Sequence, residues 1–80
     1  MLNEMKRYLF DTDYRINILK DKINIVNYQK IITLEDNKIE IIVTGKKIII
    51  KGNKLKLIKM IDEELLISGT LKTLEVIDNE

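Results

Sequence analysis

The sequence contains no cysteine, histidine, tryptophan or proline among its 80 residues. The lack of cysteine excludes a disulfide framework, a thiolate metal site and a cysteine nucleophile. The lack of histidine removes the commonest metal ligand and the commonest general base, so the lone serine, Ser68, has no histidine to activate it. Carboxylates and lysines remain, but no motif groups them around a pocket. We therefore expect a chain that is not an enzyme and that uses no cofactor or metal ion.

A long apolar run is also missing from the N-terminus, and we therefore expect no signal peptide, no membrane span and a cytoplasmic location. No linker rich in proline or serine divides the chain, and its length suits one domain with a modest core. We expect a lead-in over residues 1–13 and a single β-domain over residues 14–80. Leu2, Met5 and Leu9 follow a helical spacing, so the lead-in is either a short docking helix or a partly ordered terminus.

Alternating apolar residues dominate the centre of the chain, residues 39–58. Isoleucine, valine and leucine recur there at a period of two, which indicates half-buried strands. Two residue pairs that favour two-residue hairpin turns interrupt the pattern, Gly45-Lys46 and Gly52-Asn53. The first turn would place Val43 opposite Ile48, and both turns together keep all of the alternating apolar residues on one face.

The same pattern extends toward both ends of the chain. Further two-residue turns are expected near three pairs, Lys20-Asp21, Tyr28-Gln29 and Asp36-Asn37. After Lys59 a last pair of strands meets at a turn or bulge near Gly69, with a register that stays open. The sequence thus predicts an all-β fold: a small antiparallel up-and-down meander of about eight short strands, rolled or sandwich-like, with a possible short N-terminal helix.

These turns also predict individual cross-strand neighbours. On the apolar face, Ile18 would lie opposite Ile23, Ile32 opposite Ile41 and Leu34 opposite Ile39. On the solvated face, Glu35 would lie opposite Lys38 and Glu40 opposite Lys51, as pairs of opposite charge.

A second apolar row is predicted on the other face of the sheet, formed by Val26, Ile31, Ile42 and Ile49. An open sheet with apolar residues on both faces must cover the second face. Either the chain covers it, by coiling of the sheet or by folding over the first residues or the last strands, or the row is an interface. In the second case the partner is another copy or another protein.

The charges are distributed unevenly along the chain. Residues 41–61 contain six lysines and no acidic residue, whereas residues 62–80 contain six acidic residues and one lysine. Five of these lysines form a candidate basic surface, Lys47, Lys51, Lys54, Lys56 and Lys59. They either guard the strands against aggregation, or meet anionic lipid, a polyanion or the acidic end of a neighbouring copy. Two arginines and no aromatic residue among the lysines argue against nucleic acid as the partner.

Four stretches follow one another in the chain: Val26-Asn27-Tyr28; Ile39-Glu40-Ile41 leading to Thr44-Gly45; Ile48-Ile49-Ile50-Lys51-Gly52-Asn53-Lys54-Leu55; and Glu63-Glu64-Leu65-Leu66-Ile67-Ser68-Gly69-Thr70-Leu71 with Leu74-Glu75-Val76. In order and spacing they resemble the YabP/YqfC family of sporulation proteins of endospore-forming Firmicutes. The segment Asp62-Glu63-Glu64-Leu65-Leu66 resembles the YqfC branch more than YabP.

The resemblance implies a small β-domain without catalytic residues, made in the mother cell during spore formation. It also implies a membrane-bound protein partner at the engulfing or forespore membrane. Our hypothesis is a non-enzymatic structural or assembly module of sporulation, working by self-association or by binding a protein partner. The alternative is a peripheral module that binds anionic membranes or polyanions through the lysine-rich strands.

Overall fold

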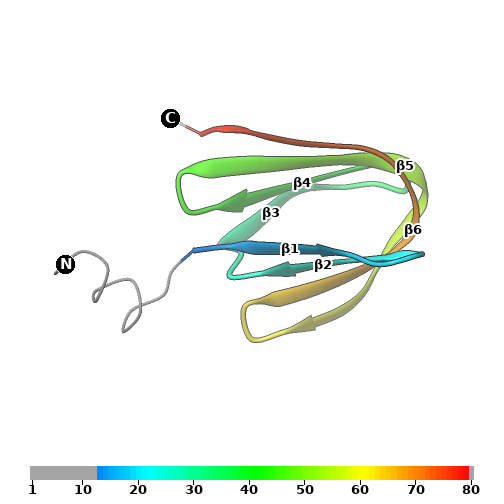
Figure 1. Ribbon diagram of the computed structural model, residues 1–80, viewed down its shortest axis with the longest axis horizontal. Helices are drawn as coiled ribbons and strands as arrows, with labels where there is room; N and C mark the ends of the chain where they lie inside the picture. The colour runs from blue at the N-terminus through cyan, green and yellow to red at the C-terminus, as the bar shows by residue number, and fades with distance from the viewer. Residues whose placement is uncertain (1–12, 80) are drawn as a thin grey trace, which may run out of the picture.

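The computed structural model describes residues 13–79, and the regular structure in this range is entirely β. The strands are β1 (Arg15–Ile18), β2 (Lys22–Val26), β3 (Lys30–Leu34), β4 (Lys38–Val43), β5 (Lys46–Ile61) and β6 (Glu64–Asp78). They form a 6-stranded antiparallel sheet in the order β1-β2-β6-β5-β4-β3, so β6 lies between β2 and β5 (Figure 1). The prediction of an all-β antiparallel fold is confirmed.

The long hairpin of β5 and β6 divides this sheet into two layers. β4 pairs with β5 only over residues 46–51, and β2 pairs with β6 only over residues 64–68. The upper layer in Figure 1 therefore contains β3, β4, the first half of β5 and the second half of β6. The lower layer contains β1, β2, the first part of β6 and the second part of β5, and the hairpin bends between the two layers.

Two glycines allow the hairpin to bend, Gly52 in β5 and Gly69 in β6. A Cβ atom on Gly52 would lie 2.0 Å from the Thr70 carbonyl oxygen, and one on Gly69 would lie 2.7 Å from the Lys54 carbonyl oxygen. Gly69 also has a φ of 130°, a conformation that other residues rarely adopt. The pairing of β5 with β6 shifts register just before Gly52 and again after Asn53, and such bulges bend a strand and increase its twist.

The hydrophobic core lies between the two layers. β2 contributes Ile23 and Ile25, and β4 contributes Ile39, Ile41 and Val43. These two strands are not neighbours in the sheet, yet their side chains belong to one buried cluster, which requires the sheet to fold onto itself. The rest of the cluster comes from the long hairpin: Ile48, Ile50, Leu55, Leu65 and Ile67. The members of this cluster between residues 23 and 55 lie on the face that the alternation predicts, whereas the sequence left the register of Leu65 and Ile67 open.

Two of the predicted turns are confirmed. The Leu19 N–H donates to the Lys22 carbonyl oxygen across Lys20-Asp21 (2.8 Å), and the Glu35 N–H donates to the Lys38 carbonyl oxygen across Asp36-Asn37 (2.9 Å). Ile18 accordingly lies opposite Ile23, and Leu34 opposite Ile39, as predicted.

The predicted turn at Gly45-Lys46 is wrong by one residue. Val43 pairs with Lys46, so the turn is Thr44-Gly45, and Ile48 lies opposite Ile41 rather than Val43. The register differs from the prediction by two residues. Because the side-chain period of a strand is also two, every side chain keeps its face, and the predicted core is unaffected.

The predicted turn at Gly52-Asn53 is also wrong. β5 continues through it to Ile61, and the hairpin closes at Asp62-Glu63, where Asp62 has a φ of 55°. Gly52-Asn53 lies at a bend within β5 and not at a hairpin turn, because β5 pairs with β6 both before and after these two residues. Merging the predicted short strands reduces their number from about eight to the six observed.

The segment at Tyr28-Gln29 crosses between the layers and is not the predicted hairpin turn. The Asn27 N–H donates to the Glu63 carbonyl oxygen in the lower layer (2.7 Å), and the Gln29 N–H donates to the Ile42 carbonyl oxygen in the upper layer (2.8 Å). Because this segment carries the chain to the other layer, β3 does not pair with β2. β2 pairs with β6 instead, and the strand order of the sheet departs from an up-and-down meander.

A bulge in β3 overturns the predicted placement of Ile32. Ile31 pairs with Ile41 and packs against the core, and the register shifts between Ile31 and Thr33. Ile32 is consequently 49% exposed. Leu34 is 53% exposed although it lies opposite Ile39, because β3 lies at the border of the sheet.

The possible N-terminal helix falls outside the described residues, which include only the last residue of the predicted lead-in, Asp13. Among residues 13–79, no helix has the length and hydropathy needed to cross a membrane.

Candidate functional site

The structure does not bring the predicted apolar row together. Val26 lies in β2 of the lower layer, opposite Arg15 and Glu64. Ile31 packs against the core. Only Ile42 and Ile49 remain on one outer face, that of the upper layer, on the neighbouring strands β4 and β5.

Ile42 is the more protected member of this remaining pair. It is 8% exposed although it does not belong to the core cluster, and its direct neighbours across the sheet are Lys30 and Lys47. Lysine stems commonly cover apolar surface while the ammonium groups stay in water. Ile42 and Ile49 thus offer a much smaller apolar area than the predicted row.

The five lysines of the candidate basic surface are divided between opposite sides of the molecule. Lys47 and Lys51 lie on the outer face of the upper layer, opposite Ile42 and Lys38. Lys56 and Lys59 lie on the outer face of the lower layer, opposite Ser68 and Leu66. Lys54 is at the bend, with a φ of 53°. No single flat surface can contact all five.

Part of the lysine charge is neutralised by Glu40. The Thr33 hydroxyl donates to Oε1 of Glu40 (2.7 Å), and the Nζ atoms of Lys47 and Lys38 lie 3.4 Å and 3.6 Å from its Oε2. The prediction that Glu40 lies opposite Lys51 is wrong, because Glu40 pairs with Ile49. The prediction that Glu35 lies opposite Lys38 is confirmed.

The Glu40 cluster makes stability depend on pH. The Thr33 hydrogen bond, and then the Lys38 and Lys47 charges, lower the pKa of Glu40 below its ordinary value of 4.5, against the opposing effect of desolvation. A lowered folded-state pKa stabilises the fold above the unfolded pKa, and this contribution is lost as the pH falls through the folded value. We expect Glu40→Gln to be less stable than the wild type near pH 7, with the difference closing below pH 4.5.

Thermal unfolding of both proteins across this pH range tests the expectation. Glu35→Gln, a change of the same kind at an exposed position, serves as the control and should show no such convergence. An equal difference between Glu40→Gln and the wild type at neutral and acidic pH would contradict the electrostatic role of Glu40.

The borders of the sheet form a feature that the sequence pattern did not reveal. Within residues 13–79, four stretches pair with a strand on one side only: β1, β3, residues 56–61 of β5 (the β5 edge) and residues 70–78 of β6 (the β6 edge). The strongly exposed large hydrophobic side chains of this range all lie on these stretches or directly beside them: Ile18, Leu19, Ile32, Leu34, Ile58, Met60, Ile61, Val76 and Ile77. Unpaired strand borders with apolar side chains are ready to pair with another chain.

One signal in the sequence could have pointed to the β5 edge. Apolar residues occupy both odd and even positions in this segment: Leu57, Ile58, Met60 and Ile61. Because successive side chains of a strand point to opposite faces, at least one of these residues must face away from a core that lies on one side of the sheet. Ile58 is the residue at which the β5–β6 register shifts, and it is 45% exposed.

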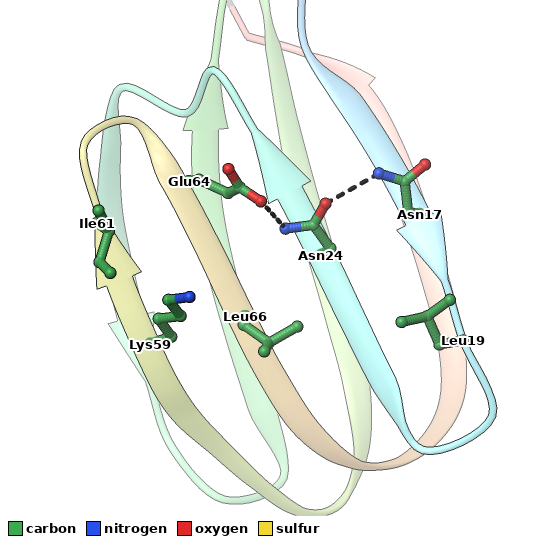
Figure 2. A pocket seen from close by; sticks show the side chains of 7 residues that line it. All are labelled: Asn17, Leu19, Asn24, Lys59, Ile61, Glu64 and Leu66. Carbon is green, nitrogen blue, oxygen red and sulfur yellow. Dashed lines mark hydrogen bonds between the residues drawn. The ribbon is translucent and has the colours of Figure 1, made fainter.

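A groove of about 430 Å³ occupies the outer face of the lower layer, next to the β5 edge (Figure 2). Its floor is a ladder of hydrogen bonds: the Asn17 amide donates to Asn24 Oδ1, and the Asn24 amide donates to Glu64 Oε1, both at 2.9 Å. Lys59 is the other charged residue in the lining, and the apolar part comes from Leu19, Ile61 and Leu66. Within residues 13–79, no three acidic side chains are grouped so that they could hold a metal ion.

The groove combines a polar floor of Asn17, Asn24 and Glu64 with an apolar wall of Leu19, Ile61 and Leu66. Its amides are already engaged with one another and with the Leu65 carbonyl oxygen, which accepts from Asn24 (3.1 Å). The strand borders are therefore the better candidate for the functional surface.

Comparison of this chain with protein-family models, with curated proteins and with solved structures finds no match.

Proposed function

We propose that the chain is a non-enzymatic assembly module of endospore formation, which works in the mother cell by joining protein partners through the borders of its sheet. The sporulation role and a membrane-bound partner at the engulfing or forespore membrane come from the resemblance to the YabP/YqfC family. One observation supports the assembly role: the exposed apolar side chains of residues 13–79 are concentrated on the four unpaired borders.

This distribution favours strand pairing as the mode of binding. A partner strand added to a sheet border gains main-chain hydrogen bonds along its length, while alternate side chains contact apolar neighbours. The five lysines do not share one surface, so the geometry favours this mode over the binding of a flat anionic membrane.

A fluorescent fusion of the full chain, followed by microscopy in a sporulating bacterium that encodes it, tests the proposal. We expect the fusion to collect at the membrane around the forespore. Met60→Lys places a charge in the β5 edge and should disperse the signal, whereas Asn53→Lys adds the same charge at an exposed position of the bend and should not.

A fusion that stays evenly distributed in the mother cell throughout sporulation would overturn the proposed role. Membrane signal that is equally strong in wild type, Met60→Lys and Asn53→Lys would overturn the part played by the β5 edge.

A further inference from the structure

We infer that the β5 edge of one copy pairs with the β6 edge of a second copy, so that copies join head to tail into an open chain. This inference rests on the proposed assembly role and specifies the partner as the protein itself. Four observations carry it: the two edges are unpaired, opposite in charge, complementary in side-chain register and located at opposite borders of the molecule.

Both edges offer free strand borders. β4 leaves β5 after Lys51, and β2 leaves β6 after Ser68. From residue 56 onward β5 is paired only with β6, and from residue 70 onward β6 is paired only with β5, among the residues that the structure describes. The β5 edge carries three strongly exposed apolar residues, Ile58, Met60 and Ile61, more than any of the other three borders.

The charges of the four borders differ in sign. β1 contains Arg15, β3 contains Lys30, and the β5 edge contains Lys56 and Lys59, none of them with an acidic residue. The β6 edge is the one border of the described sheet with carboxylates, Glu75 and Asp78, which outnumber its single lysine, Lys72. Opposite charges across two strands stabilise their pairing, whereas two copies of the β5 edge would place lysine near lysine.

The two charges needed for the contact are available. Asp78 is engaged with Lys46 within its own copy. Within residues 13–79, neither Lys59 nor Glu75 takes part in an ion pair or a side-chain hydrogen bond. Both lie on the outer face of their layer, Lys59 opposite Leu66 and Glu75 opposite Ile49.

An antiparallel pairing with Lys59 opposite Glu75 aligns the side chains by face over residues 59–61, on the C-terminal side of the register shift at Ile58. It places Met60 opposite Leu74, and both of these point to the core side of their layers, since they pair with Leu65 and Ile50 within their own copies. The apolar interior of one copy would thus continue into the next. Register in a sheet is specified in this way wherever one face is apolar.

The geometry of the molecule makes the contact heterologous. In Figure 1 the end of β6 runs along the top border of the view, and the closing turn between β5 and β6 lies at the bottom. Pairing one border with the other leaves a free β6 edge at one end and a free β5 edge at the other. Contacts of this kind propagate unless their rotation closes a ring.

Sedimentation equilibrium of the full chain over a wide concentration range tests the pairing. We expect the mean mass of the wild type to keep rising with concentration, without a plateau at the dimer, and to fall with added salt. Lys59→Glu or Glu75→Lys places like charges across the contact and should weaken association by about tenfold in the dissociation constant. An equimolar mixture of the two variants restores an opposite charge at every contact and should associate like the wild type.

Lys51→Glu is the matched control, because it reverses a lysine of the same strand at a position flanked by both β4 and β6. It should leave association unchanged. Equal weakening by Lys51→Glu and Lys59→Glu, or a mixture that stays as weak as the single variants, would overturn the pairing. Recovery in the mixture also shows that both variants are folded.

The same data separate this inference from the proposed function. The pairing of the β5 and β6 edges is overturned if neither charge reversal changes the dissociation constant of the oligomers. It is also overturned if the wild type is monomeric at every concentration. Either result leaves the assembly role to be decided by the localisation of the fusion protein.

Discussion

Replacing Gly52 with alanine is expected to destabilise the protein by about 3 kcal/mol, because the new methyl group has no room. Its Cβ atom would lie 2.0 Å from the Thr70 carbonyl oxygen and 3.2 Å from Leu55 Cδ2. The first contact is with the backbone of β6, so β5 and β6 must separate where the hairpin bends. In a domain of this size the melting temperature should fall by about 15 °C, as measured by circular dichroism.

Gly45→Ala is the control for this effect. Gly45 has a φ of 73°, and a Cβ atom there would meet nothing within 4 Å. Alanine should therefore lower the free energy of unfolding by only about 1 kcal/mol, because a residue with a Cβ atom is less stable in the left-handed conformation. Equal destabilisation by the two changes would contradict the close packing of the bend.

Truncating Ile50 to alanine is expected to lower the free energy of unfolding by about 4 kcal/mol. Ile50 is fully buried between the layers, opposite Ile39 in β4 and Leu74 in β6. Removing its side-chain atoms leaves a cavity that neighbours on two strands cannot easily fill. Urea unfolding monitored by circular dichroism provides the measurement.

Ile58→Ala makes the same chemical change farther along β5. Because Ile58 is 45% exposed, we expect a loss below about 1 kcal/mol. The contrast tests the arrangement of the two halves of β5, the first between two strands and the second at a border. A larger loss at Ile58 than at Ile50 would contradict it.

The core could be predicted from the sequence because its signal is local and tolerant of error. Ile48 and Ile50 alternate with outward residues, and a register error of two residues at the Thr44-Gly45 turn leaves them on the same face. The turn at Lys20-Asp21 was equally local, since polar residues separate two short apolar runs there.

The bend and the sheet order could not be predicted, because they depend on distant parts of the chain. Gly52-Asn53 has the composition of a turn, and only the close approach of the Thr70 backbone shows that it is a bend within a strand. The pairing of Ile25 with Leu65 joins residues far apart in sequence with no connecting turn to signal it.

The candidate site was missed for a related reason. Dividing β5 at Gly52 ends the predicted central strands at residue 58, short of Met60, whereas the structure places Met60 at a sheet border, 51% exposed. The row of Val26, Ile31, Ile42 and Ile49 assumed that β2 pairs with β3, and the pairing of β2 with β6 separates its members. In β3 a bulge determines that Ile31, and not Ile32, faces the core. The sequence does not indicate which of these two adjacent isoleucines is buried.

Hydrogen exchange of the full chain at low and at high protein concentration tests assembly through the strand borders most directly. We expect amide protection within residues 56–61 and 70–78 to increase with concentration, because these amides gain partners in a second copy. β1 and β3 should exchange at unchanged rates. Exchange that is independent of concentration at both edges, or protection that rises only in β1 and β3, would contradict pairing of the β5 edge with the β6 edge.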